Sequence, residues 1–257
     1  MPVVTLPSGL NIFYRESGSG DRTLLLIHGN VSSSIWWEKV MALLPAGVKV
    51  YAPDLRNCGD SGHTEPNWSM HDLAHDIFQF TQVVGIRRAT VVGHSLGGAV
   101  AQQLTVEHPD LVERLLLLNS AEPAGLQTSD AAYAQIEAIR NNPTVVKMAL
   151  VAMAPTAPKD EFLTTILEES ATKSTSGWIQ NGRALQTMNL VADVAKIKVP
   201  VLIIRGAQDA LVTAEMMERA HKQIPGSVLE TWPEVGHSAN VEAPERFTRR
   251  LVEFMGL

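Results

Sequence analysis

The sequence ATVVGHSLGG, residues 89–98, runs from a short apolar segment directly into a glycine-rich turn. Its apolar part predicts a buried strand over 89–95, and the pattern of 96–107 predicts a helix. A serine at such a sharp strand-to-helix turn is held in a strained conformation with its side chain clear of the sheet. Ser95 is therefore the candidate nucleophile, and the helix that follows aims backbone N–H groups toward it. The alternative is an ordinary glycine-rich turn with an incidental serine.

The segments around this turn alternate between strand and helix patterns. An opening hairpin is expected from the runs VVTL and LNIFYRES, and Ser69 and Asp72 indicate a capped helix start. Unbroken apolar strands that alternate with helices are typical of a parallel sheet. The expected strands are 3–6, 10–17, 23–29, 49–54, 89–95, 114–120, 199–209 and 227–232, and the expected helices are 33–44, 69–84, 96–107, 213–223 and 244–255.

From about residue 122 to residue 199 the strand pattern is lost. Helical segments rich in Ala, Met, Thr and Gln, and broken by prolines, take its place. The sequence therefore predicts an α/β fold in which a helical insertion interrupts a mostly parallel sheet.

Length and composition restrict the class of protein. A chain of 257 residues with 45% apolar and 19% charged residues fits one globular enzyme domain. The net charge of −6 argues against nucleic acid or an anionic membrane as the main partner. One cysteine excludes an intrachain disulfide, and the first residues do not resemble a signal peptide. We expect a cytoplasmic protein without a metal, since the histidines lack metal-binding spacing, and without a cofactor.

A serine nucleophile needs a base and an acid. Of the eight histidines, His237 lies in a loop after the last predicted strand, at the edge of the sheet that Ser95 occupies. Asp209, just past another strand, is the preferred acid; Glu122 is the alternative, and Asp209 could instead cap a helix. The less favoured bases are His28 and His94, both fixed at strand ends, and His63, His71, His75, His108 and His221, which are expected in solvent. Cys58 has no predicted base or helix N-terminus beside it and is expected to be structural.

Five motifs resemble those of the α/β-hydrolase family over nearly the whole chain. GHSLGG looks like its nucleophile elbow, and the order Ser95, Asp209, His237 is the usual one. The others are HGN (28–30), DLRNCGDS (54–61), GAQD (206–209) and EVGH (234–237), with Asn57 where glycine is usual. The resemblance implies an eight-stranded, mostly parallel sheet with a core of residues 1–121 and 196–257. It further implies a helical cap, residues 122–195, inserted after the sixth strand.

The resemblance also implies an oxyanion hole made by two backbone N–H groups, those of Asn30 and Leu96. HGN loops occur in the related haloalkane dehalogenases, where the asparagine amide faces the halide. Those enzymes have an aspartate nucleophile, so Ser95 argues against dehalogenation. A catalytic role for the Asn30 side chain is a separate hypothesis.

Several cap residues are candidates for an apolar substrate pocket, although core packing would explain them equally well. These are Val31 on the oxyanion loop and Met148, Met153, Phe162, Trp178 and Met188 in the insertion. Arg140 and Arg183 could meet an anionic substrate, or they could be solvated helix positions.

The leading hypothesis is a serine hydrolase that cleaves a small carboxylic ester or lactone through an acyl-enzyme. The family's carbon–carbon bond hydrolases often have tryptophan after the catalytic histidine, where this chain has Ser238. That reading is less favoured, as is a ligand-binding or signalling protein on a hydrolase scaffold. The exact substrate and the oligomeric state stay open.

Overall fold

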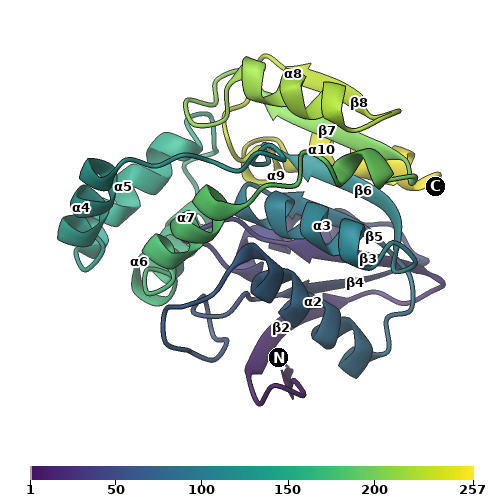
Figure 1. Cartoon of the computed structure of the whole chain (residues 1–257), viewed down its shortest axis with the longest axis horizontal. Coiled ribbons are helices and arrows are strands. Elements are labelled where there is room, and N and C mark those ends of the chain that lie inside the picture. The colour runs from purple at the N-terminus through teal and green to yellow at the C-terminus, as the bar shows by residue number, and fades with distance from the viewer. Residues whose placement is uncertain (1) are drawn as a thin grey trace.

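The computed structural model describes residues 2–257, and a twisted eight-stranded sheet forms its centre (Figure 1). The spatial order is β1-β2-β4-β3-β5-β6-β7-β8. β1 pairs antiparallel with β2, β2 pairs antiparallel with β4, and all later pairs are parallel. The expected mostly parallel sheet is confirmed. The strands are β1 Val3–Thr5, β2 Asn11–Ser17, β3 Arg22–Ile27, β4 Val48–Pro53, β5 Ala89–His94, β6 Val112–Leu118, β7 Val201–Gly206 and β8 Val228–Trp232.

Helices cover both faces of the sheet because its strands are apolar on both faces. In β3, Leu25 and Ile27 face one core cluster while Leu24 and Leu26 face the other, as the two-residue period of a strand requires. The first cluster includes side chains of α2 Met70–Val84, α3 Leu96–Glu107 and α8 Ala214–Gln223. The second includes side chains of η1 Ser34–Trp37, α1 Glu38–Leu43, α9 Ala239–Glu242 and α10 Pro244–Met255.

The helix boundaries follow local signals where the sequence provides them. Ser69 accepts from the backbone N–H of Asp72, whose carboxylate accepts in return from the Ser69 N–H, so α2 begins with the expected capping box. It ends at Gly85, which is left-handed with φ 79°. The segment 33–44 differs from expectation. It starts as a 3-10 turn after Ser33, whose side chain forms no capping bond, and becomes α-helical only from Glu38.

Four helices follow the sixth strand and lie together at one end of the sheet (Figure 1). The second and third of them share a small apolar core that includes Val146 and Ile166 and continues into Trp36 near the sheet. The predicted helical insertion after the sixth strand is confirmed. Its elements are α4 Asp130–Ile139, α5 Pro143–Met153, α6 Glu161–Lys173, α7 Trp178–Thr187 and the short turn η2 Val194–Lys196. Among residues 2–257, no helix has both the length and the apolar character needed to cross a membrane.

Candidate active site

Ser95 occupies the turn between β5 and α3 in a conformation that L-residues rarely adopt. Its φ is 54° and its ψ −118°, which costs on the order of 1–3 kcal/mol. The two flanking glycines make the turn possible. A Cβ on Gly93 would collide with the carbonyl of Gly97, and one on Gly97 would collide with the carbonyl of Ile27. The sequence therefore places the Ser95 hydroxyl, which is partly exposed, at the end of the buried strand β5.

His237 and Asp209 form a buried pair at the same edge of the sheet. Nδ1 of His237 lies 2.6 Å from Oδ2 of Asp209. A carboxylate only accepts, so Nδ1 carries the proton and Nε2 is left as the basic nitrogen. The other oxygen of Asp209 accepts from the backbone N–H groups of Leu211 at 2.8 Å and Val212 at 3.0 Å. Burial acts to raise the pKa of Asp209, but the bond to His237 and these N–H donors outweigh it and lower the pKa to about 2.

Asn119 supports this pair, and the sequence analysis did not find it. Its amide Nδ2 donates to Oδ2 of Asp209 at 2.5 Å, and its Oδ1 accepts from the backbone N–H of Gly206 at 3.2 Å. Asn119 directly follows β6 in the left-handed region, with φ 42°. A polar residue at the carboxyl end of a buried strand was the available signal, because such ends gather at one edge of a parallel sheet.

The alternative acid and nucleophile are bound elsewhere. Glu122 pairs with Arg219 through two bonds of 2.8 and 2.6 Å and does not contact His237. Thr213, not Asp209, caps α8. Cys58 is fully buried, and that burial raises the pKa of its thiol. The geometry therefore favours Asp209 and Ser95 over both alternatives.

The two histidines beside the site are structural and neutral. Nε2 of His94 donates to the backbone carbonyl of His237 at 2.9 Å, and burial lowers the pKa of His94 to about 3. Nδ1 of His28 donates to the carbonyl of Gly29, and its Nε2 accepts from the N–H of Leu55 at 2.9 Å. Burial lowers the pKa of His28 to about 4. Both therefore position loops rather than transfer protons.

The other histidines make contacts away from this pair. The partners are Ser176 for His63, Glu107 for His71, Gln79 for His75, the ring of Phe78 for His108 and Ser227 for His221.

The loop that carries His237 is held by Glu242, which sequence reasoning also missed. The carboxylate of Glu242, only 8% exposed, accepts from the backbone N–H groups of Gly236 and Ser238, both at 2.8 Å. It also accepts from the N–H and hydroxyl of Thr156, between α5 and α6. The N–H of His237 donates to the carbonyl of Met153 at 3.1 Å. The helical insertion therefore takes part in fixing the base.

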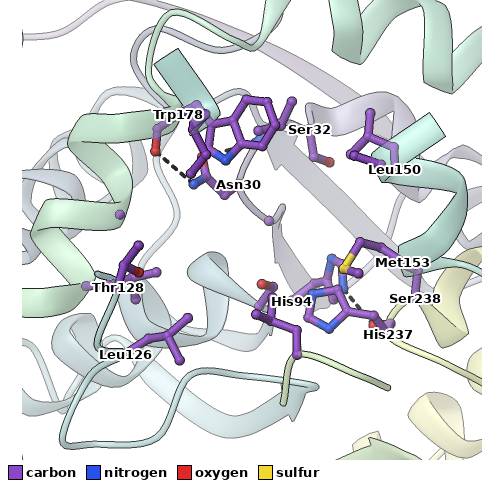
Figure 2. Close-up of a pocket in the computed structure, with 18 of the residues that line it drawn as sticks. Asn30, Ser32, His94, Leu126, Thr128, Leu150, Met153, Trp178, His237 and Ser238 are labelled. Carbon is purple, nitrogen blue, oxygen red and sulfur yellow. Dashed lines mark hydrogen bonds between the residues drawn. The ribbon is translucent and has the colours of Figure 1, made fainter. Parts of the chain in front are cut away.

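A second connection to the insertion starts at Asn30. Its Nδ2 donates to the backbone carbonyl of Trp178 at 3.1 Å (Figure 2). Its Oδ1 accepts from Nδ2 of Asn181 at 3.0 Å. The same oxygen accepts a hydrogen bond from the backbone N–H of Val31, a β-branched residue in the left-handed region with φ 51°. Among the described residues no protein group accepts from the backbone N–H of Asn30 or of Leu96. Both N–H groups are therefore free to bind a ligand oxygen.

A mainly apolar cavity of about 390 Å³ joins these parts. Ser95, His94 and His237 line it, and Trp178, Leu150, Leu126 and Thr128 stand around the same space (Figure 2). Within the described chain no hydrogen bond joins the Ser95 hydroxyl to His237. The arrangement provides a partly exposed serine, an oriented imidazole and two unpaired N–H donors around one apolar space.

The family model described as "Alpha/beta hydrolase family" matches residues 24–250. The chain belongs to the alpha/beta hydrolase family. The resemblance given by its motifs is thereby confirmed.

Two curated relatives cover nearly the whole chain. The 2-(acetamidomethylene)succinate hydrolase of Mesorhizobium japonicum is 27% identical over 254 residues, which is 94% of this chain and 90% of the relative. The 3-oxoadipate enol-lactonase 2 of Acinetobacter baylyi is 26% identical over 254 residues, 94% of this chain and 92% of the relative. An esterase from Exiguobacterium antarcticum has the same fold, with a TM-score of 0.88, 24% identity and 99% of each chain covered.

The pocket residues expected for this alpha/beta hydrolase are placed unevenly. Val31, Met153 and Trp178 line the cavity. Met148 does not, because it is 69% exposed on the outer side of α5. Met188 is buried in the core beneath the insertion, and Phe162 packs on the insertion's own core beside Lys39. Residues not anticipated from the sequence also line it, among them Leu126, Thr128, Tyr133, Ile136, Leu150 and Leu185.

Asn57, which replaces the family's usual glycine, has a physical explanation. Its φ is 59°, the left-handed region that asparagine tolerates better than most residues. Its amide also bonds the backbone of Thr64 in both directions, at 3.0 and 2.9 Å. The turn therefore keeps its shape without glycine.

Among residues 2–257, no three His, Cys, Asp or Glu side chains are grouped as metal ligands.

Proposed function

We propose that this hydrolase cleaves carboxylic esters or lactones through an acyl-enzyme on Ser95. The observation that carries the proposal is the 2.6 Å bond from His237 to Asp209, whose carboxylate also accepts from Asn119 and from two backbone N–H groups. His237 and Ser95 line the same cavity. The relatives named as a lactonase and an esterase support the same chemistry.

In the proposed reaction the Ser95 hydroxyl attacks the acyl carbon while Nε2 of His237 takes its proton. The oxygen that becomes negative accepts from the N–H groups of Asn30 and Leu96. His237 then gives the proton to the departing alkoxide, which leaves an ester on Ser95. A water molecule, deprotonated by His237, then attacks the acyl carbon; the bond to Ser95 breaks, His237 returns the proton to the Ser95 oxygen, and the acid is released. Asp209 stays ionised throughout and holds the imidazolium, in line with its lowered pKa.

We infer that residues 122–195 act as a cap over this reaction. The inference is supported by Met153 and Trp178, which line the cavity from α5 and α7, and by the bond from His237 to Met153. A cap that excludes water strengthens the electrostatic interactions beneath it.

The test is hydrolysis of short p-nitrophenyl esters by the wild type and by Ser95→Ala, together with mass spectrometry after treatment with an alkyl fluorophosphonate. We expect turnover and a single covalent adduct in the wild type, and loss of both in the variant. Ser32→Ala, at the same cavity, is the matched control. If Ser95→Ala kept most of the esterase activity, the proposal would be wrong. A ring-fission dienol assayed in parallel tests the alternative hypothesis that the enzyme hydrolyses a carbon–carbon bond, which Ser238 does not support.

A further inference from the structure

The wall of the cavity carries no formal charge. Within residues 2–257, no Asp, Glu, Lys or Arg side chain lines it. Its surface comes mainly from apolar side chains of the β3–η1 loop, η1, the loop before α4, and α4, α5 and α7. Those side chains include Trp36, Leu126, Ile136, Leu150, Met153 and Leu185.

Three basic side chains of the insertion, Arg140, Lys147 and Arg183, are directed to other partners. Arg140 binds Glu137 through two bonds of 2.9 Å, and Lys147 binds Glu168 at 2.5 Å. Arg183 lies over the ring of Tyr133, 5.7 Å from its centre, and is not itself part of the wall. The two arginines that an anionic substrate could have met are therefore outside the cavity.

The polar groups of the wall do not replace a cation. The histidine ring of His94 is neutral, because its Nε2–H is bound to the carbonyl of His237 and burial lowers its pKa to about 3. His237 must itself be neutral to act as a base. The Tyr133 hydroxyl donates to Gln186 at 3.1 Å, so its only proton is already engaged. A carboxylate in this cavity would lose its hydration without gaining a counter-charge.

We propose that the substrate is an uncharged ester or lactone with mainly apolar groups on both sides of the scissile bond, and that carboxylate-bearing esters of equal size are rejected. This rests on the proposed function and specifies its substrate class. At about 390 Å³, the cavity lies near the lower end of the range of about 300–1,000 Å³ that is usual for small-molecule pockets. The substrate is accordingly a compact one.

Two ethyl esters of equal size test the proposal. Ethyl 6-methylheptanoate ends in an isopropyl group, and monoethyl adipate ends in a carboxylate of nearly the same shape and with the same number of non-hydrogen atoms. We expect kcat/KM, measured by pH-stat titration at neutral pH, to be at least about a hundredfold higher for the neutral ester, because an unpaired carboxylate is costly to bury. Equal rates, or preference for the adipate, would overturn the inference and leave ester hydrolysis intact.

A charge-insertion pair at Thr128, on the cavity wall, gives an independent readout. Thr128→Lys adds a cation where the wall has none, and Thr128→Met adds a neutral chain of similar length. We expect the preference for the neutral ester to fall at least about tenfold in Thr128→Lys and to persist in Thr128→Met. A preference that fell equally in both variants would contradict the electrostatic explanation.

Labelling with the fluorophosphonate distinguishes failure of the proposed function from failure of the proposed substrate class. A wild-type enzyme that neither hydrolyses the two esters nor reacts with the alkyl fluorophosphonate would sink the proposed function itself. An enzyme that is labelled at Ser95 but turns over only the charged ester, or neither, would overturn the substrate class alone.

Discussion

Substitution of Glu242 by glutamine is expected to damage both stability and catalysis, although its side chain is not expected to touch substrate. The carboxylate of Glu242 binds the backbone on both sides of His237, through the N–H groups of Gly236 and Ser238. It binds Thr156 of the insertion as well. Every neighbour in this set donates, so an ionised carboxylate satisfies all of them.

Glutamine keeps the shape but has one acceptor oxygen and an NH2 group. Its NH2 must face at least one buried N–H, most simply that of Ser238, which leaves this donor unsatisfied at about 1–3 kcal/mol. The remaining bonds lose the strength that the charge gave them. We therefore expect Glu242→Gln to lower the free energy of unfolding by about 2–4 kcal/mol in total. The loop would also shift the imidazole of His237, and a displacement of order 1 Å can lower kcat about a hundredfold.

Urea denaturation and steady-state hydrolysis of a neutral ester measure the two effects. Glu218→Gln, an exposed position on α8, is the matched control and should change neither by much. Thr156→Val removes the hydroxyl that joins the insertion to the carboxylate but leaves the bonds beside His237 in place. It should lower kcat less than Glu242→Gln does. Wild-type stability and kcat in Glu242→Gln would refute the positioning role, and a loss of stability alone would reduce it to a structural one.

Three further predictions follow from the same geometry. Asn119→Ala removes one donor from Asp209 and should lower kcat about tenfold with little change in KM, as ester kinetics will show. Burial lowers the pKa of His28 to about 4, so the unfolded chain takes up a proton first as the pH falls below about 6.5, and the folded state loses stability. In His28→Gln the free energy of unfolding, measured with urea, should therefore fall less steeply between pH 6 and 4.5, by up to about 1.4 kcal/mol per pH unit. Asn30→Ala releases the oxyanion loop from Trp178 and should lower kcat more than tenfold, while the free energy of unfolding falls by only about 1–2 kcal/mol. A variant with wild-type kcat would show that only the backbone of Asn30 matters.

The sheet could be predicted because its strands are marked in the sequence by unbroken apolar runs with turn residues at each end. β5 and β7 are buried along their whole length, as the unbroken apolar runs and their short length predict. Ser95, Asp209 and His237 could be placed at one edge because each follows a strand of a parallel sheet. Their shared position depends only on the topology of the sheet, which the local sequence largely determines.

The pocket could be predicted only in part because it depends on how helices rotate against one another. Met148 and Met153 are both on α5, yet one is exposed and the other lines the cavity. The apolar pattern of α5 does not say which of its faces meets the cavity and which meets α6. The same holds for Glu242, whose four hydrogen-bond donors come from two loops far apart in the sequence. Contacts of that kind follow from tertiary packing and leave no local pattern.

Backbone strain separates what was found from what was missed at this site. Ser95, Val31 and Asn119 all have positive φ values, and each lies next to the cavity or to Asp209. Glycine would adopt these conformations without strain, and Val31 in particular contradicts its own propensity. Such conformations persist only where surrounding bonds hold them, as the Oδ1 of Asn30 holds the N–H of Val31. Three of the four non-glycine residues with positive φ among residues 2–257 therefore lie at the site, the fourth being Asn57, and of these three only Ser95 had flanking glycines to reveal it.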